Sequence, residues 1–186
     1  MSIKTFYPGQ VEEAKGNSVR FYDNIAFSAI GSWNIPNITN SFKHLKIVLQ
    51  ARGSTAAAEV PVIIRFNNDS GTNYDGQRFL FYGTSTATQQ IAFATTGAPL
   101  CNIPGSTATA GMASNHEFMI SNYSKSTFNK YIIGMGTQFQ GVTSSDMRAE
   151  IPAGGWRNTS EINRITILPE TGNFEIGSHL TIYLLS

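Results

Sequence analysis

Apolar and polar residues alternate with a period of two through most of this chain. In residues 45–52, for example, Leu45, Ile47 and Leu49 share one face of an extended backbone. This alternation is typical of strands that have one face buried and the other face open to solvent. Helical periodicity is confined to a turn around residues 160–163. The chain is therefore expected to be all-β.

The alternation predicts about ten strands, with turn residues between them. The predicted strands are residues 19–30, 45–52, 60–66, 78–82, 89–94, 116–123, 131–139, 147–151, 161–168 and 180–184. Many short antiparallel strands without intervening helices are typical of a β-sandwich or a β-barrel. Nucleotide-binding α/β folds are not expected, because they need alternating strands and helices.

Two of the predicted strands carry faces that we expect to contribute to the core. The faces are Tyr131, Ile133, Met135, Thr137 and Phe139 in the first strand, and Met147, Ala149 and Ile151 in the second. Each set recurs at every second residue, so its members lie on one side of the strand.

The chain divides into an N-terminal arm, residues 1–18, and a single β-sandwich domain, residues 19–186. A chain of 186 residues is long enough to bury a sizeable core without disulfides. Within the domain, residues 83–114 are rich in Gly, Ser, Thr and Ala and are expected to form a long surface loop.

Composition narrows the classes of function. The net charge is +1 and charged residues make up 13% of the chain, against about 25% in typical soluble domains. Without a basic stripe, we do not expect a nucleic-acid partner. We also expect no membrane span and no signal peptide, since no long apolar stretch occurs. The chain is thus expected to be made in the cytoplasm.

The residues that could carry chemistry do not form a recognisable catalytic set, so we expect no enzymatic activity and no cofactor. Cys101 follows an apolar segment and is expected to be a small core residue. His44, His116 and His179 fall at strand edges or on polar strand faces, and they lack the spacing of a preformed zinc site. No Gly-x-Ser-x-Gly motif is present.

The segment from residue 67 to residue 76 is rich in Asn, Asp and Gly, which favours a hairpin loop. The alternative is a calcium site formed by Asp69, Asn73 and Asp75, although the segment lacks the full spacing of a calcium-binding loop. Four residues near turns are candidates for contacts with a glycan, and they are Trp33, Trp156, Asn73 and Tyr74. Aromatic residues in strands are more often part of a core or a subunit interface.

Six blocks of the sequence occur together in an order and spacing that resemble a widespread type of uncharacterised virion protein from tailed bacteriophages. The blocks are SWNIP at 32–36, FKHLKI at 42–47, IRFNNDSGTNY at 64–74, GWR at 155–157, INRITI at 162–167 and GNFEIGSHLTIY at 172–183. The resemblance runs from about residue 30 to the C-terminus and does not include the arm.

This resemblance implies a jelly-roll-like antiparallel β-sandwich of eight to ten strands in a bacteriophage particle. The chain is expected to be a capsid decoration (cement) protein that stabilises the head. It is expected to form a homo-oligomer, and the expected oligomeric state is a trimer. Its partners would be other virion proteins such as the major capsid protein, contacted through Phe6, Tyr7 and Val11 of the arm. The alternative is a fibre or receptor-binding module that recognises host surface glycans.

Overall fold

The computed structural model describes residues 18–83 and 88–186, and this part of the chain forms twelve β-strands. The strands are β1 (Ser18–Ile25), β2 (Trp33–Ile35), β3 (His44–Ala51), β4 (Glu59–Phe66), β5 (Tyr74–Tyr82), β6 (Thr88–Thr95), β7 (Ala98–Pro104), β8 (Ser114–Ile120), β9 (Lys130–Phe139), β10 (Met147–Trp156), β11 (Ile165–Pro169) and β12 (His179–Leu185). A short 3₁₀ turn spans Ser144–Asp146. In the described part of the chain, no helix is long and apolar enough to cross a membrane.

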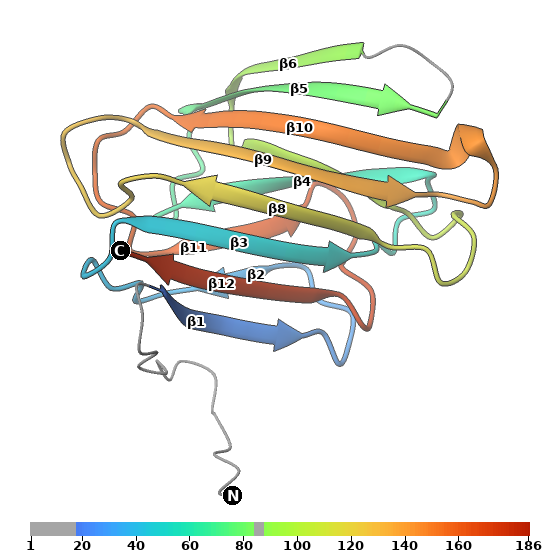
Figure 1. Cartoon of the computed structure of the whole chain (residues 1–186), viewed down its shortest axis with the longest axis horizontal. Coiled ribbons are helices and arrows are strands. Elements are labelled where there is room, and N and C mark those ends of the chain that lie inside the picture. Colours follow the sequence, from blue (N-terminus) through green and yellow to red (C-terminus); the bar gives the residue numbers. More distant parts are fainter. Residues whose placement is uncertain (1–17, 84–87) are drawn as a thin grey trace, which may run out of the picture.

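The strands form two antiparallel sheets that lie face to face (Figure 1). The larger sheet has the order β1-β12-β3-β8-β9-β10-β5-β6, and the smaller has the order β2-β11-β4-β7. The predicted all-β antiparallel sandwich is confirmed. All ten predicted strands are present, and the two that sequence reasoning missed are β2 and β7.

Eight of the strands pair in the order of a jelly roll. When β5, β6, β9 and β10 are left aside, the first strand pairs with the last, and the pairing continues inward along the sequence. The pairs are β1 with β12, β2 with β11, β3 with β8, and β4 with β7. Successive pairs alternate between the two sheets, which produces the double-sheet jelly roll that was expected.

The remaining four strands are two insertions that extend one sheet. The pair β5 and β6 follows β4, and the pair β9 and β10 follows β8. They join edge to edge beyond β8, at the top of Figure 1. We call β1-β12-β3-β8 the jelly-roll half of the large sheet and β9-β10-β5-β6 the inserted half.

The aliphatic core lies where the four-stranded sheet faces the jelly-roll half. Leu45, Ile47 and Leu49 of β3 and Ile182 of β12 have no exposed surface. Complete burial of such a side chain stabilises a fold by about 1.5–3 kcal/mol. The predicted burial of this face of residues 45–52 is therefore confirmed.

The inner side of the inserted half is different, because β7 is the main strand of the small sheet that packs against β9, β10 and β5, while β4 contributes the Phe66 ring against Tyr74 and Trp156. Several of its buried side chains are polar, including Arg78, Gln138 and Glu150. The expected core faces of β9 and β10 are correspondingly wrong. Residues 131, 133, 135, 137 and 139 point outward, as do residues 147, 149 and 151, while the alternate residues point inward.

The long surface loop predicted at residues 83–114 is also wrong over much of its length. It contains β6 and β7, and Leu100, Cys101 and Ile103 of β7 are fully buried. β7 lies at the edge of the small sheet and pairs only with β4, a position that tolerates Pro99 and Pro104 because the edge needs fewer backbone donors.

Other expectations concern the ends and turns. Residues 1–17, which include Phe6, Tyr7 and Val11, lie outside the described residues, and β1 begins at Ser18. Residues 67–73 connect β4 of the small sheet to β5 of the large sheet, so they do not form a hairpin. Asn67 and Asn68 there have φ of 52° and 60°, as expected of Asn in a left-handed turn. The expected helical turn around residues 160–163 does not form.

Candidate assembly surface

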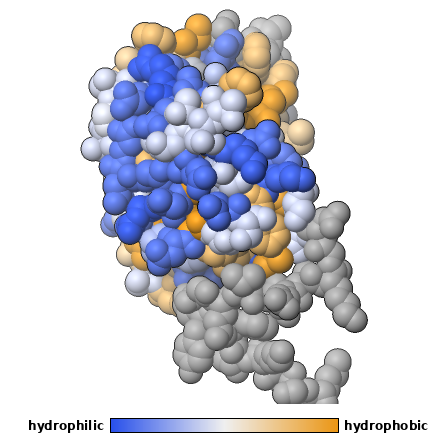
Figure 2. All heavy atoms as spheres, turned by 90° about the vertical axis from the view of Figure 1, so that its left-hand side faces the viewer, coloured by the Kyte–Doolittle hydropathy of each residue, from blue (hydrophilic) through white to orange (hydrophobic). Residues whose placement is uncertain are grey.

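The outer side of the inserted half carries a continuous set of exposed apolar side chains, which we call the apolar face. Its members are Phe79, Phe81, Ile91, Phe93, Tyr131, Ile133, Met135, Phe139, Met147 and Ile151. The outer side of an antiparallel sheet is ordinarily polar when it faces water. Figure 2 shows hydrophobic residues gathered at the upper right, the side on which this face lies, and hydrophilic residues over most of the remaining surface.

Strand register places these side chains in rows across the sheet. Ile133 of β9 is opposite Ala153 of β10, which is opposite Gln77 of β5. Gln77 in turn pairs with Ile91 of β6. Ile151 of β10 is directly opposite Phe79 of β5, and Met147 is opposite Phe139 of β9. Neighbouring side chains in such rows are about 5 Å apart, so the apolar residues form one surface that also includes the polar Gln77.

Two glycines explain why β9 presents its apolar residues outward. Gly134 and Gly136 occupy inward positions, where a Cβ would overlap the rings of Phe118 and His116 of β8. These two rings lie parallel at 6.0 Å and extend across β9. The inner side of β9 therefore has no room for large side chains at these positions.

A groove of about 1150 Å³ opens at one end of the apolar face, beside the loop between β8 and β9. Ile91, Phe93 and Tyr131 line it together with Phe128 of that loop. The guanidinium of Arg157 lies 5.1 Å from the centre of the Phe93 ring. Aromatic residues, Met and Arg are the residue types enriched at protein–protein interfaces.

The apolar face is large enough to serve as an interface. With about 200 Å² for each large side chain at roughly half exposure, ten of them present on the order of 1,000 Å². A standard interface buries about 800 Å² on each partner, and the largest apolar patch on a typical monomer is about 300–600 Å².

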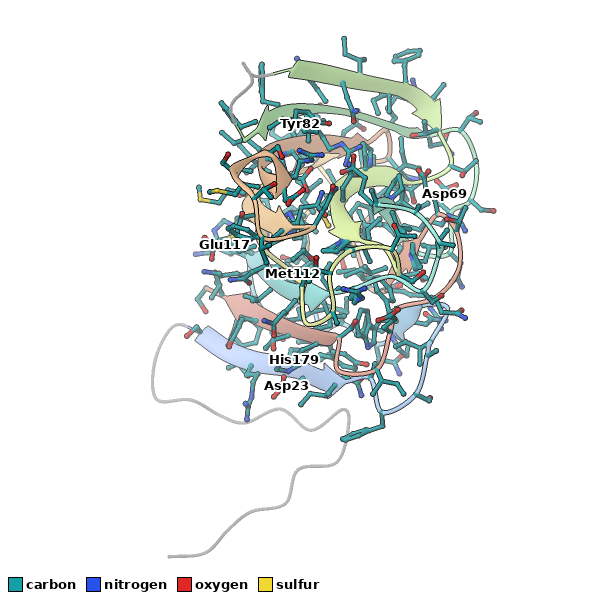
Figure 3. The ribbon with its side chains drawn as sticks, turned by 90° about the vertical axis from the view of Figure 1, so that its right-hand side faces the viewer. Asp23, Asp69, Tyr82, Met112, Glu117 and His179 are labelled. Atoms are coloured by element: carbon teal, nitrogen blue, oxygen red, sulfur yellow. The ribbon has the colours of Figure 1, made fainter. Side chains whose placement is uncertain are left out.

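Charged groups lie at the border of the apolar face. Glu117 of β8 points outward and forms an ion pair with Lys46 of β3 at 2.6 Å (Figure 3). An apolar centre with a polar rim is the usual anatomy of an interface.

The residues proposed for glycan contact do not form an exposed site. Trp33 and Trp156 are each only 2% exposed, and Tyr74 is fully buried. Trp33 donates its indole Nε1–H to Asn24 Oδ1 at 2.8 Å, and Trp156 donates its own to Asp69 Oδ2 at 2.7 Å. Both tryptophans thus stabilise the sandwich, since a buried indole N–H needs an acceptor. Asn73 alone among the four is exposed.

The oxygen atoms proposed for calcium are already engaged. Asp69 accepts hydrogen bonds from Trp156, from the Asn73 side chain and from the Gly71 backbone. Burial alone would raise the pKa of Asp69, but these hydrogen bonds together lower it below 3.8. Asp75 accepts from the Ala94 backbone at 2.8 Å. The arrangement is a turn-stabilising network, because Asn73 directs its amide nitrogen and not its oxygen toward Asp69.

A second polar cluster lies between the two sheets, beneath the inserted half. It brings together Cys101 of β7, His116 of β8 and Glu150 of β10, all of them buried. The expectation that all three histidines lie on edges or polar faces is therefore wrong for His116. One signal was available in the sequence, because His116 shares the period-two phase of Phe118 and Ile120, which are buried.

Cys101 is confirmed as a buried residue of the core. Burial, and after it the charge of Glu150, raise the pKa of the Cys101 thiol well above its ordinary value. A thiol in this environment is protonated and is a poor nucleophile.

Comparisons with known proteins add no relative to this picture. No protein-family model matches the chain, and no curated protein is significantly similar to it.

Proposed function

We propose that this chain is a structural protein of a bacteriophage particle, and that its leading candidate role is capsid decoration. In this proposal the chain is a homo-oligomer whose subunits meet through the apolar face. The observation that carries the oligomer is the apolar face itself. The face exposes on the order of 1,000 Å² of apolar surface. Burying it against a partner would stabilise the assembly by about 25 cal/mol for each Å² removed from water.

A second copy of the chain is the partner that fits this surface best. The centre of the apolar face has no charged side chain among its ten members, so two copies can meet without burying an unpaired charge. The net charge of +1 adds almost no repulsion between copies. Identical chains also supply the matching surface at equal concentration, and closed symmetric assemblies are the usual result.

The placement in a virion rests on the resemblance of the six sequence blocks to phage virion proteins. A decoration protein must add stability to a shell through many weak, repeated contacts, and oligomers achieve this by multivalency. A neutral surface rich in Ser, Thr and Asn suits packing against a protein shell. The trimer remains the expected copy number, and the major capsid protein remains the expected second partner.

The oligomer is tested by measuring the molar mass of the full chain by light scattering at micromolar concentrations. We expect a small multiple of the chain mass for the wild type and a monomer for the double variant Ile133→Glu, Ile151→Glu. Ile176→Glu is the matched control, because Ile176 is 72% exposed but lies outside the apolar face. A monomeric wild type, or an unchanged mass for the double variant, would refute assembly through this surface.

The position in the particle is tested separately, by counting copies of the chain in purified virions. Hundreds of copies would support a decoration protein of the head. A handful of copies in the tail would favour the fibre or receptor-binding alternative, and binding to a glycan panel would then be the next measurement. Absence of the chain from particles would overturn the virion assignment while leaving the oligomer test intact.

A further inference from the structure

Three side chains with metal-binding atoms meet between the two sheets. Cys101 comes from the small sheet, and His116 and Glu150 come from the large sheet. One ligand atom of each lies within 4.8 Å of the others, and all three residues are buried. A thiol, an imidazole and a carboxyl group are the three donor types that proteins use for zinc.

His116 is the member of this set whose polar atoms are least satisfied. Its side chain has no exposed surface, and its Nε2 lies 2.8 Å from Oε1 of Glu150. Neither ring nitrogen makes a well-aligned hydrogen bond with any described residue. Buried polar atoms in folded proteins are nearly always paired, so an imidazole held in this way calls for a ligand. Gly136 leaves the space that the ring occupies.

Glu150 is held in place by neighbours that do not compete for all of its lone pairs. Its Oε1 accepts a hydrogen bond from the Asn102 backbone at 2.8 Å, and its Oε2 lies 3.5 Å from Nη1 of Arg78. Hydrogen bonds of this kind orient carboxylate ligands at metal sites.

The electrostatics of the surroundings favour a cation. Glu59 accepts hydrogen bonds from the side chains of Asn102 and Gln138, so a second carboxyl group belongs to the same network. The network thus holds two carboxyl groups, Glu59 and Glu150, and one guanidinium, that of Arg78, which lies 3.5 Å from Glu150. An uncompensated charge in a buried site is costly, and one added cation would reduce that cost.

We propose that Cys101, His116 and Glu150 bind one zinc ion, which joins β7 of the small sheet to β8 and β10 of the large sheet. Zinc suits a mixed sulfur, nitrogen and oxygen set, whereas calcium and magnesium prefer oxygen ligands alone. Ligand atoms on a tetrahedral zinc lie about 3.5 Å apart, so the three side chains must shift by up to about 1 Å, and Nε2 of His116 and Oε1 of Glu150, which lie 2.8 Å apart, must separate. On binding, the thiol proton of Cys101 is released to solvent and the thiolate becomes a ligand.

Such an ion would act where the sandwich lacks an aliphatic core. Around Arg78, Gln138 and Glu150 the inner side of the inserted half is polar and is covered mainly by β7, so a metal bridge there would replace missing apolar contacts between the sheets. The competing explanation is an ion pair between a protonated His116 and Glu150, which needs no metal.

Because the three residues are buried, zinc should enter while the chain folds. The full chain is unfolded, freed of metal with a chelator under reducing conditions, and refolded with or without zinc sulfate. We expect one zinc per chain by elemental analysis after refolding and removal of free metal, together with a higher thermal midpoint. Less than stoichiometric zinc after this procedure would overturn the proposal in favour of the ion pair.

Two variants and a spectroscopic probe identify the ligands. Loss of an outer-shell partner typically weakens metal binding by about 10–100-fold, so Cys101→Ala should weaken it by at least about 100-fold. Val62→Ala is the matched control, because Val62 is opposite Cys101 in the β4–β7 pairing and is equally buried, but supplies no ligand. Equal zinc affinity in Cys101→Ala and the wild type would exclude Cys101.

Refolding the wild type with cobalt(II) gives a readout that does not depend on any variant being stable. A thiolate ligand produces a ligand-to-metal charge-transfer band in the near ultraviolet. Its presence at one equivalent of cobalt supports the site even if Cys101→Ala fails to fold. Its absence, with cobalt bound, would show that the metal is held elsewhere and would overturn the proposal.

Discussion

In the jelly-roll half of the large sheet, β3 directs Leu45 and Ile47 toward the small sheet and Lys46 away from it. In the inserted half, β9 does the reverse, with Ile133 and Met135 outside and polar Gln138 inside. Both strands show the same period-two alternation. The comparison teaches that alternation marks a strand with two different environments, and that the partner on each side decides which environment is apolar.

The difference follows from how each half is covered. Opposite the jelly-roll half, the small sheet supplies apolar side chains such as Val62 and Ile64 of β4. Opposite the inserted half, β7 is the main cover, and Asn102 of β7 belongs to a polar network with Arg78 and Glu150. A strand in the inserted half is therefore stabilised more by apolar contacts on its outer side than on its inner side. Under our proposal, another subunit provides these outer contacts.

The largest expected effect is the difference in stability between two truncated variants, one in each half of the large sheet. We expect Ile47→Ala to lower the free energy of unfolding by about 2–5 kcal/mol, because a cavity replaces a fully buried side chain. Ile133→Ala should change it by no more than about 0.5 kcal/mol when measured by chemical denaturation of the monomeric chain. Equal losses would mean that the outer side of β9 is buried within the chain itself.

A smaller effect should come from adding a methyl group inside the inserted half. A Cβ at position 136 would overlap the His116 ring and lie 2.6 Å from the Asn115 carbonyl oxygen. Gly136→Ala should therefore destabilise the fold by about 1–3 kcal/mol, the usual cost of overpacking. Gly155→Ala is the control, since the closest atoms that its Cβ would meet are those of the Tyr131 ring, at 3.3 Å. Similar denaturation midpoints for the two variants would argue against the close packing of His116 on β9.

The contribution of Asp69, in the connection that leads from β4 into the inserted half, to the stability of the fold should depend on pH. The pKa of Asp69 is lower in the folded chain than its ordinary 3.8, because hydrogen bonds from Trp156 and Asn73 outweigh the effect of burial. A lowered pKa contributes stability that is complete above about pH 4 and is lost as the pH falls through the folded-state value.

Asp69→Asn should accordingly cost on the order of 1 kcal/mol at pH 7, since the charged acceptor of the Trp156 N–H becomes neutral. The difference in thermal midpoint between wild type and variant should narrow as the pH is lowered below about 4. A difference that stays constant or widens down to pH 3 would contradict the role of the charge.

The smallest effect is expected on the outer side of the jelly-roll half. Lys46 and Glu117 form a close ion pair, but their side chains are 36% and 50% exposed. Glu117→Gln should change the free energy of unfolding by less than about 1 kcal/mol, and added salt should reduce even that. A much larger loss in the oligomer than in the monomer would show that this half is also covered by another subunit.

Sequence patterns predicted the jelly-roll strands well and the inserted region poorly. The apolar face of residues 45–52 was assigned correctly, because it meets another apolar sheet in the same chain. β7 was missed because its prolines and the Gly, Ser and Thr residues around it are typical of a loop, and only its place at a sheet edge makes them acceptable. His116 was misplaced although it shares the period-two phase of Phe118 and Ile120. The two tryptophans were candidates for glycan contact only in the alternative interpretation, because local sequence does not report the acceptor that lies opposite each of them.

The sequence by itself determined that the chain is all-β, where ten of its strands lie, and that residues in each strand alternate between two sides. These properties depend on local backbone geometry and on the order of residues in the chain. Only the tertiary structure decided which side of β9 and β10 faces inward, that β7 packs against them, and that Cys101, His116 and Glu150 meet. Those outcomes depend on pairings between strands far apart in the sequence, and period two alone is unchanged when the inner and outer sides are exchanged.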